Sequence, residues 1–147
     1  MSERSGDMNG KVALISGASR GIGRATAARL AAAGCDVIML ARKAEVLMRA
    51  AAEISAEYGV RALPIACHCG RSEDIEAVFK RIGEEFGRLD IVVNNAATNP
   101  HFGMLRDGNA DLLRKILDTN VVGYYMMSMA ALPLLEKSAA PVIVNIS

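Results

Sequence analysis

Short continuous apolar runs alternate along the chain with stretches in which apolar residues recur every three or four positions. The runs predict strands of a parallel sheet covered on both faces, and the periodic stretches predict helices with one buried side. The predicted strands are Val12 to Ile15, Val37 to Leu40, Ala62 to Cys67, Ile91 to Val93 and Val142 to Ile146. The predicted helices are Gly21 to Ala33, Lys43 to Tyr58, a third that begins at Ser72 as its N-cap and has an inward stripe reaching Phe86, and Ala110 to Lys137.

This alternation is typical of βαβ units, whose right-handed crossovers place all the strands in one sheet. We therefore predict an α/β fold, a Rossmann-type doubly wound parallel sheet of five strands in the order 3-2-1-4-5, with helices on both faces. Residues 11–147 would form this domain, and residues 1–10 a loose N-terminal tail.

Composition narrows the classes of function. Apolar residues make up 52% of the 147, and the net charge is +1, so no field of one sign would attract nucleic acid or an anionic membrane. No apolar run is long enough to cross a bilayer. Three cysteines (Cys35, Cys67 and Cys69) are an odd number without a recognisable secretion signal, which favours free thiols in a reducing, cytoplasmic compartment.

The segment from Ser16 to Gly23 lies between the first predicted strand and the first predicted helix, with glycines at positions 17, 21 and 23. Small residues there let the backbone approach a pyrophosphate, and the start of the helix supplies amide donors. The glycine spacing differs from the general G-x-G-x-x-G pattern. The segment predicts a dinucleotide site, and a tight turn without a ligand is the alternative.

The residues after the second predicted strand distinguish NADP from NAD. An NAD site usually has a carboxylate there, whereas this sequence has Ala41, Arg42 and Lys43. Arg20 is a further guanidinium near the same region, and a guanidinium can bind a 2′-phosphate through two hydrogen bonds. NADP(H) is therefore the predicted cofactor. The alternative is that Arg42 and Lys43 are solvated residues at the start of a helix.

Four segments resemble, in order and spacing, the motifs of the classical branch of the short-chain dehydrogenase/reductase family. They are Ser16 to Gly23, Asn94 to Ala97, Asn120 to Gly123 and Val142 to Ser147. Further residues are similar to the NADP-dependent carbonyl and retinal reductases of that family, namely Asn95 to Pro100, Phe102-Gly103 and Cys67-His68. The resemblance covers nearly the whole chain. It implies hydride transfer between NADP(H) and a ketone, aldehyde or alcohol, in a dimer or tetramer.

The resemblance also implies roles for single residues. Asn120 would hold a water of the family's proton relay, and it is the one catalytic residue assigned here. Arg42 and Lys43 would bind the 2′-phosphate, while His68 and Cys69 would lie beside the adenine. The other cofactor-binding residues would be Gly17, Ser19, Arg20, Gly21, Ile22, Gly23, Asn95, Ala96, Ala97 and Ile146.

The sequence departs from the family pattern in two places and lacks its catalytic end. Ala97 replaces a common glycine, and His68 stands where an aspartate usually contacts the adenine. The family also needs a serine after the Asn-Ile-Ser triplet and a Tyr-x-x-x-Lys, which occurs nowhere in the sequence. We expect the chain to be truncated before the last βα units and inactive by itself. A nucleotide-binding fragment without catalysis is the alternative function, and a methyltransferase fits the glycine spacing poorly.

Two histidines invite other roles. The side chains of Cys67, His68 and Cys69 would alternate faces at a strand end, with no second ligand pair at zinc spacing, so no metal site is predicted. His101 lies in the loop expected over the substrate, where it would contact substrate or remain a solvated loop residue.

Overall fold

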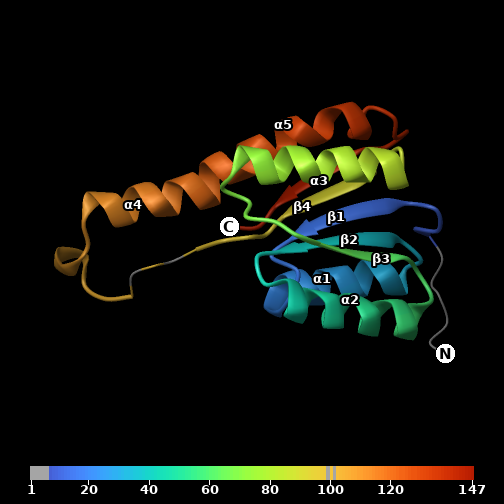
Figure 1. Ribbon diagram of the computed structural model, residues 1–147, viewed down its shortest axis with the longest axis horizontal. Helices are drawn as coiled ribbons and strands as arrows, with labels where there is room; N and C mark the ends of the chain where they lie inside the picture. The colour runs from blue at the N-terminus through green and yellow to red at the C-terminus, as the bar shows by residue number, and fades with distance from the viewer. Residues whose placement is uncertain (1–6, 99, 101) are drawn as a thin grey trace.

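A computed structural model describes residues 7–98, 100 and 102–147, and its sheet confirms the predicted architecture (Figure 1). Five parallel strands lie in the order β3-β2-β1-β4-β5. They are β1 (Val12–Ser16), β2 (Asp36–Ala41), β3 (Ala62–Ala66), β4 (Ile91–Asn94) and β5 (Val142–Asn145). The α-helices are α1 (Gly21–Ala32), α2 (Ala44–Tyr58), α3 (Ser72–Glu85), α4 (Ala110–Leu117) and α5 (Gly123–Leu135).

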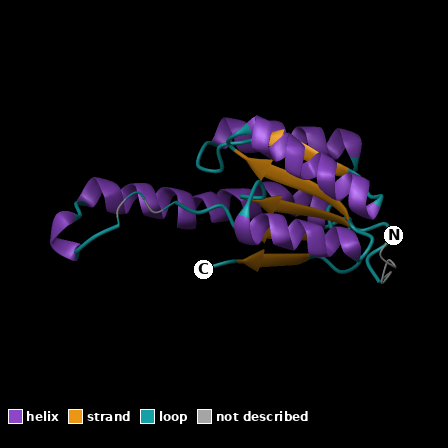
Figure 2. Ribbon diagram, turned by 90° about the horizontal axis from the view of Figure 1, so that it is seen from below, coloured by secondary structure: helices purple, strands orange, loops and turns teal. Residues whose placement is uncertain are grey.

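Helices lie on both faces of the sheet and bury β1 and most of β2, whereas every residue of the edge strand β5 is exposed. Helices α1 and α2 lie on one face and α3 and α5 on the other, while α4 extends beyond the sheet (Figures 1 and 2). The side chains of β1 alternate between the two layers. Ala13 and Ile15 belong to the core with α1 and α2, whereas Leu14 belongs to the core with α3 and α5. A strand buried on both sides explains the continuous apolar runs in the sequence.

The helical segment predicted from Ala110 to Lys137 is not continuous. A π-helical turn, Asp118–Val122, separates α4 from α5, and the backbone N–H of Gly123 donates to the carbonyl of Asp118. Such turns insert one extra residue into a helix and often lie at functional sites. The apolar spacing does not reveal the insertion. The family resemblance, however, implies that Asn120 interrupts a helix, and Asn120 lies within this turn.

One other prediction is wrong, at the start of a helix. Ser72 is not the N-cap of α3 but its first residue, and the N-cap is Arg71, which makes no side-chain cap bond. The carboxylate of Asp74 instead accepts a hydrogen bond from the backbone N–H of His68 (2.8 Å) and so closes the preceding loop. Residues 7–10, at the end of the expected loose tail, form a turn attached to the end of α1 through the N–H of Met8.

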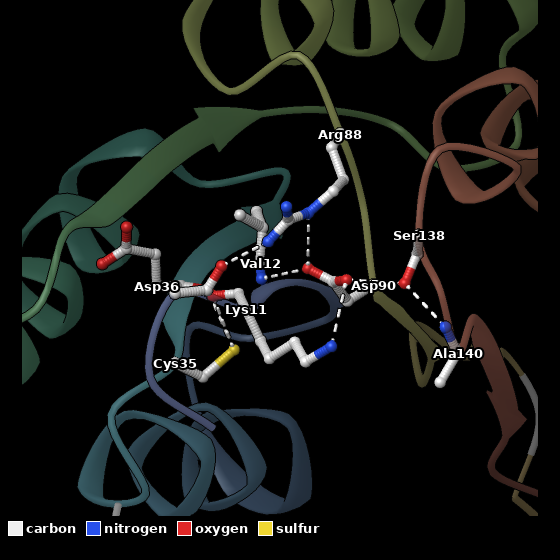
Figure 3. A network of polar contacts seen from close by, with 9 residues as sticks. Lys11, Val12, Cys35, Asp36, Arg88, Asp90, Ser138 and Ala140 are labelled. Atoms are coloured by element: carbon white, nitrogen blue, oxygen red, sulfur yellow. Dashed lines mark hydrogen bonds and ion pairs between the residues drawn. The ribbon is translucent and has the colours of Figure 1, made fainter. Parts of the chain in front are cut away.

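A buried carboxylate fastens the amino-terminal edge of the sheet (Figure 3). The side chain of Asp90 is 2% exposed and accepts hydrogen bonds from the N–H of Val12 (2.9 Å), the hydroxyl of Ser138 (2.6 Å) and the guanidinium of Arg88 (3.2 Å). Burial alone would raise the pKa of Asp90, but these hydrogen bonds and the charge of Arg88 outweigh it and lower that pKa. The network joins β1 and β4 at the edge opposite the candidate site.

Candidate functional site

The glycine turn after β1 is packed closely against its own helix and against the end of β4. Gly17 has a φ of 64°, and a Cβ there would lie 3.0 Å from the Cα of Ala96. A Cβ on Gly23, in the first turn of α1, would overlap the carbonyl oxygen of Gly17 and lie 2.8 Å from its carbonyl carbon. The N–H of Ala18 donates to the carbonyl of Leu40 (2.9 Å), which fixes the turn to β2. Glycine at positions 17 and 23 is thus required by the shape of the turn.

Two side chains lock this turn to β4. The hydroxyl of Ser16 accepts hydrogen bonds from the backbone N–H groups of Asn95 and Ala96, both at 2.9 Å. The side-chain amide of Asn95 donates to the carbonyls of Ser16 (3.1 Å) and Gly17 (3.3 Å). Ser16 was not among the site residues predicted from sequence. Its signal was its position at the end of the first strand, where a polar residue follows a buried apolar run.

The start of α1 remains open to a ligand. Arg20 is the N-cap with extended backbone and makes no side-chain cap bond, and the first turn contains no acidic residue. Gly21 and Ile22 are exposed, and Ser19 is half-buried. The first N–H groups of a helix have no partner within the helix, and together with the helix dipole they favour an anion. This end of α1 has the properties expected of a pyrophosphate site.

A second feature lies one strand further out, at the carboxyl ends of β2 and β3. A cavity of about 270 Å³ is lined by Arg42, Ala66, Cys67, His68, Arg71 and Asp74. Arg42 follows β2, and the other residues belong to the end of β3 and to the loop and first turn of α3. The cavity therefore brings together two of the predicted residues, Arg42 and His68. Lys43, the N-cap of α2, is exposed and does not line it.

Hydrogen bonds donated by its backbone N–H groups fix the loop between β3 and α3. The N–H of Cys67 donates to the carbonyl of Ala41 at the end of β2 (3.0 Å). The N–H of Gly70 donates to Nδ1 of His68 (3.1 Å), and the N–H of Arg71 donates to the carbonyl of His68 (2.9 Å). Nδ1 of His68 therefore acts as an acceptor within this loop.

Cys67 and Cys69 interact at the same strand end. A hydrogen bond from the Cys67 thiol lowers the pKa of Cys69, and the same contact, with burial, raises the pKa of Cys67. Cys67 is buried and Cys69 is half-buried. The described residues contain no group of three or more His, Cys, Asp or Glu side chains placed to hold a metal ion.

Asn120 lies in the π-helical turn and contacts the segment that follows β4. Its side-chain oxygen accepts from the N–H of Thr98 (2.9 Å), and its side-chain amide donates to the carbonyl of Thr98 (3.1 Å). Gly123 ends this turn, where a Cβ would lie 2.8 Å from the carbonyl oxygen of Cys69. The hydroxyl of Tyr124 donates to the carbonyl of Ile146 (3.0 Å). The π turn and the first residues of α5 thus contact the segments that follow β3, β4 and β5.

The predicted residues gather at one edge of the sheet, in two groups. The glycine turn, Asn95 and Ala96 form the first group, and Arg42 lies with His68 in the second. Ala97 is exposed beyond β4, and Ile146 is half-buried after β5. His101 lies outside the described residues, so its predicted role stays a prediction. Arg71 is the lining residue that sequence reasoning missed, because its place depends on the shape of a loop.

The parallel sheet in the order β3-β2-β1-β4-β5, with helices on both faces, defines the Rossmann-type α/β class. The profile of the family described as short chain dehydrogenase matches residues 11–147. The chain belongs to the short-chain dehydrogenase/reductase family.

Known proteins support this assignment. Dehydrogenase/reductase SDR family member 4 of Oryctolagus cuniculus is 40% identical over 127 residues, which are 86% of this chain and 48% of that protein. A metagenomic short-chain oxidoreductase in complex with NADP matches with a TM-score of 0.87 and 33% identity over 95% of this chain and 63% of its own. A xylitol dehydrogenase bound to NAD⁺ matches with a TM-score of 0.88 and 32% sequence identity. The match covers 95% of this chain and 53% of the xylitol dehydrogenase chain. The chain spans about half the length of the curated relatives it matches.

Within the described residues, no helix combines the length and the apolar character that a membrane crossing requires.

Proposed function

We propose that this chain binds NADP(H) and forms the cofactor-binding part of an oxidoreductase acting on a ketone, aldehyde or alcohol. When bound, the nicotinamide would supply or accept the hydride. The observation that carries the proposal is Arg42, which lines the cavity beside the glycine turn. Among the described residues it pairs with no carboxylate. An unpaired guanidinium at this position suits a 2′-phosphate and not a 2′-hydroxyl.

The residues of this chain would divide the work of binding. The N–H groups at the start of α1 would hold the pyrophosphate, and Ser16 and Asn95 would keep the turn in shape. Asn120 would act where the π turn meets Thr98, close to the ends of β4 and β5. Because the sequence contains no Tyr-x-x-x-Lys, the proposal for this chain is cofactor binding. Hydride transfer is proposed for the whole protein.

The test is the replacement Arg42→Asp. A carboxylate would repel the 2′-phosphate and accept hydrogen bonds from a 2′-hydroxyl, so preference should move from NADPH toward NADH by at least about tenfold. The change in preference is measured as the dissociation constants of NADPH and NADH, by calorimetry on wild type and on the variant. An unchanged preference would refute the assignment of Arg42.

A homo-oligomer, a dimer or a tetramer, is part of the proposal. Its support is a row of exposed apolar side chains, four residues apart, that runs along α4, the π turn and α5. The row consists of Leu113 (56% exposed), Leu117 (45%), Val121 (57%), Tyr125 (65%) and Met129 (50%). Large apolar side chains exposed repeatedly along one helical segment are typical of an interaction site. Three free thiols agree with the expected cytoplasmic, reducing location.

A further inference from the structure

Arg71 lines the same cavity as Arg42, although the two residues are far apart in the sequence and come from different loops. Arg42 follows β2, and Arg71 is the N-cap of α3, after β3. The strands β2 and β3 are neighbours, with Ala41 paired to Ala66 at their ends. Two arginines from two neighbouring loops therefore line one cavity.

Among the described residues, the guanidinium of Arg71 has no ion-pair partner. Its backbone N–H donates to the carbonyl of His68 (2.9 Å), and its carbonyl accepts from the N–H of Ile75 (3.2 Å), so the backbone is fixed. The residue is exposed, and its guanidinium forms no ion pair with any described residue. In contrast, Arg81 on the same helix pairs with Glu85 at 2.7 Å. The guanidinium of Arg71 is thus free to bind a ligand.

Arg71 decides the sign of the charge in the cavity. The lining contains one carboxylate, that of Asp74, and two guanidiniums. Asp74 already accepts a hydrogen bond from the N–H of His68. With both arginines the cavity is positive, and without Arg71 the charges of Arg42 and Asp74 would cancel. Arg71 therefore makes the lining more favourable for a phosphate dianion.

The position of the cavity selects which phosphate it would take. The pyrophosphate site is at the start of α1, after β1, and the cavity lies beyond β2, toward β3. Neighbouring strands are roughly 5 Å apart, so one to two strands separate the sites by roughly 5 to 10 Å. That distance is of the order of an adenosine ribose and its substituents. A phosphate on the 2′ position would therefore reach the cavity while the pyrophosphate stays on α1.

We propose that Arg71 is a specificity-determining residue that binds the 2′-phosphate of NADP(H) from the side opposite Arg42. This inference rests on the proposed function. It replaces Lys43 as the expected partner of Arg42, because Lys43 does not line the cavity. A phosphate held between two guanidiniums accepts charge-assisted hydrogen bonds from both. A 2′-hydroxyl carries no charge, so it gains no ion-pair attraction from either arginine.

The experiment measures the dissociation constants of NADPH and NADH by calorimetry for wild type, Arg71→Gln, Arg71→Lys and Arg42→Gln. Arg81→Gln is the matched control, since it removes one positive charge from the same helix at its far end. We expect Arg71→Gln to weaken NADPH binding by about tenfold or more and to leave NADH binding unchanged. Arg71→Lys should recover part of the loss, and Arg81→Gln should change neither constant.

Each result that differs from these expectations would contradict a particular claim. Unchanged NADPH binding in Arg71→Gln, or an equal loss of NADPH and NADH binding, overturns the role of Arg71. If Arg42→Gln loses NADPH preference and Arg71→Gln does not, the proposed function stands and this inference fails. If wild type binds neither cofactor, the proposed function fails and this inference falls with it. NADH binding by each variant also reports that the variant is folded.

Discussion

Gly23 offers the sharpest test of how the glycine turn is built. A Cβ at this position would overlap the carbonyl oxygen of Gly17 and lie 2.6 Å from Nδ2 of Asn95 and 2.8 Å from the carbonyl carbon of Gly17. Carbon atoms in contact are ordinarily about 3.5–4.0 Å apart. In Gly23→Ala, the backbone of Gly17 must therefore move by roughly 1 Å. That movement would break the hydrogen bond from Asn95 to Gly17.

Overpacking of this kind costs about 1–3 kcal/mol of the free energy of unfolding. For a chain of this size the midpoint of thermal unfolding should fall by roughly 2 to 10 °C. NADPH affinity should fall by at least about tenfold, because the displaced backbone belongs to the proposed pyrophosphate cradle.

Gly83→Ala is the matched control. Gly83 lies inside α3, and a Cβ there would meet only Cδ2 of Leu134, at an ordinary 4.0 Å. Alanine in place of a helix-interior glycine should raise stability by about 0.5–1 kcal/mol and leave NADPH binding unchanged. Thermal unfolding followed by circular dichroism, and calorimetry with NADPH, give both quantities. If Gly23→Ala melts and binds NADPH like wild type, the account of the turn is wrong.

Two further predictions concern stability and assembly. The pKa of Asp90 is lower in the folded than in the unfolded state, so the ionised carboxylate stabilises the fold. This contribution is complete above the pKa of the unfolded state, about 3.9, and is lost as the pH falls through the lower pKa of the folded state. Asp90→Asn should therefore be less stable than wild type at pH 7 by about 1–3 kcal/mol and should lose less stability in acid. Equal unfolding free energies in urea at pH 7 would contradict this. The exposed row from Leu113 to Met129 predicts self-association in sedimentation equilibrium, and a purely monomeric chain at micromolar concentration would refute the oligomer.

The sheet could be predicted because burial on both faces leaves a direct signal in the sequence. Runs such as Val37 to Leu40 have no polar positions, and the right-handed crossover then permits few topologies. The glycine turn was also predictable, since its position between a strand and a helix restricts what it can hold. The confirmed strand order brings the ends of β1 and β2 together, and so places the turn and Arg42 at one edge of the sheet.

The π turn, the start of α3 and the place of Arg71 depend on local geometry, which the spacing of apolar residues does not show. A π turn adds one residue to a helix without changing which residue types it contains, so apolar spacing does not show the break at Asp118–Val122. Only the family motif at Asn120 to Gly123 indicated an interruption there. Ser72 is a favourable N-cap residue, but the hydrogen bond between Asp74 and His68 closes the loop and places the helix start differently. Arg71 enters the cavity through that same loop, which is why sequence reasoning chose Lys43 beside Arg42 instead.

The central claim is that this chain holds NADP(H) through a glycine turn and an arginine-lined cavity. Calorimetric titration of the wild-type chain with NADPH and with NADH tests it most directly. The account predicts that both cofactors bind and that NADPH binds at least about tenfold more tightly. Tighter binding of NADH, or no binding of either cofactor, would contradict it.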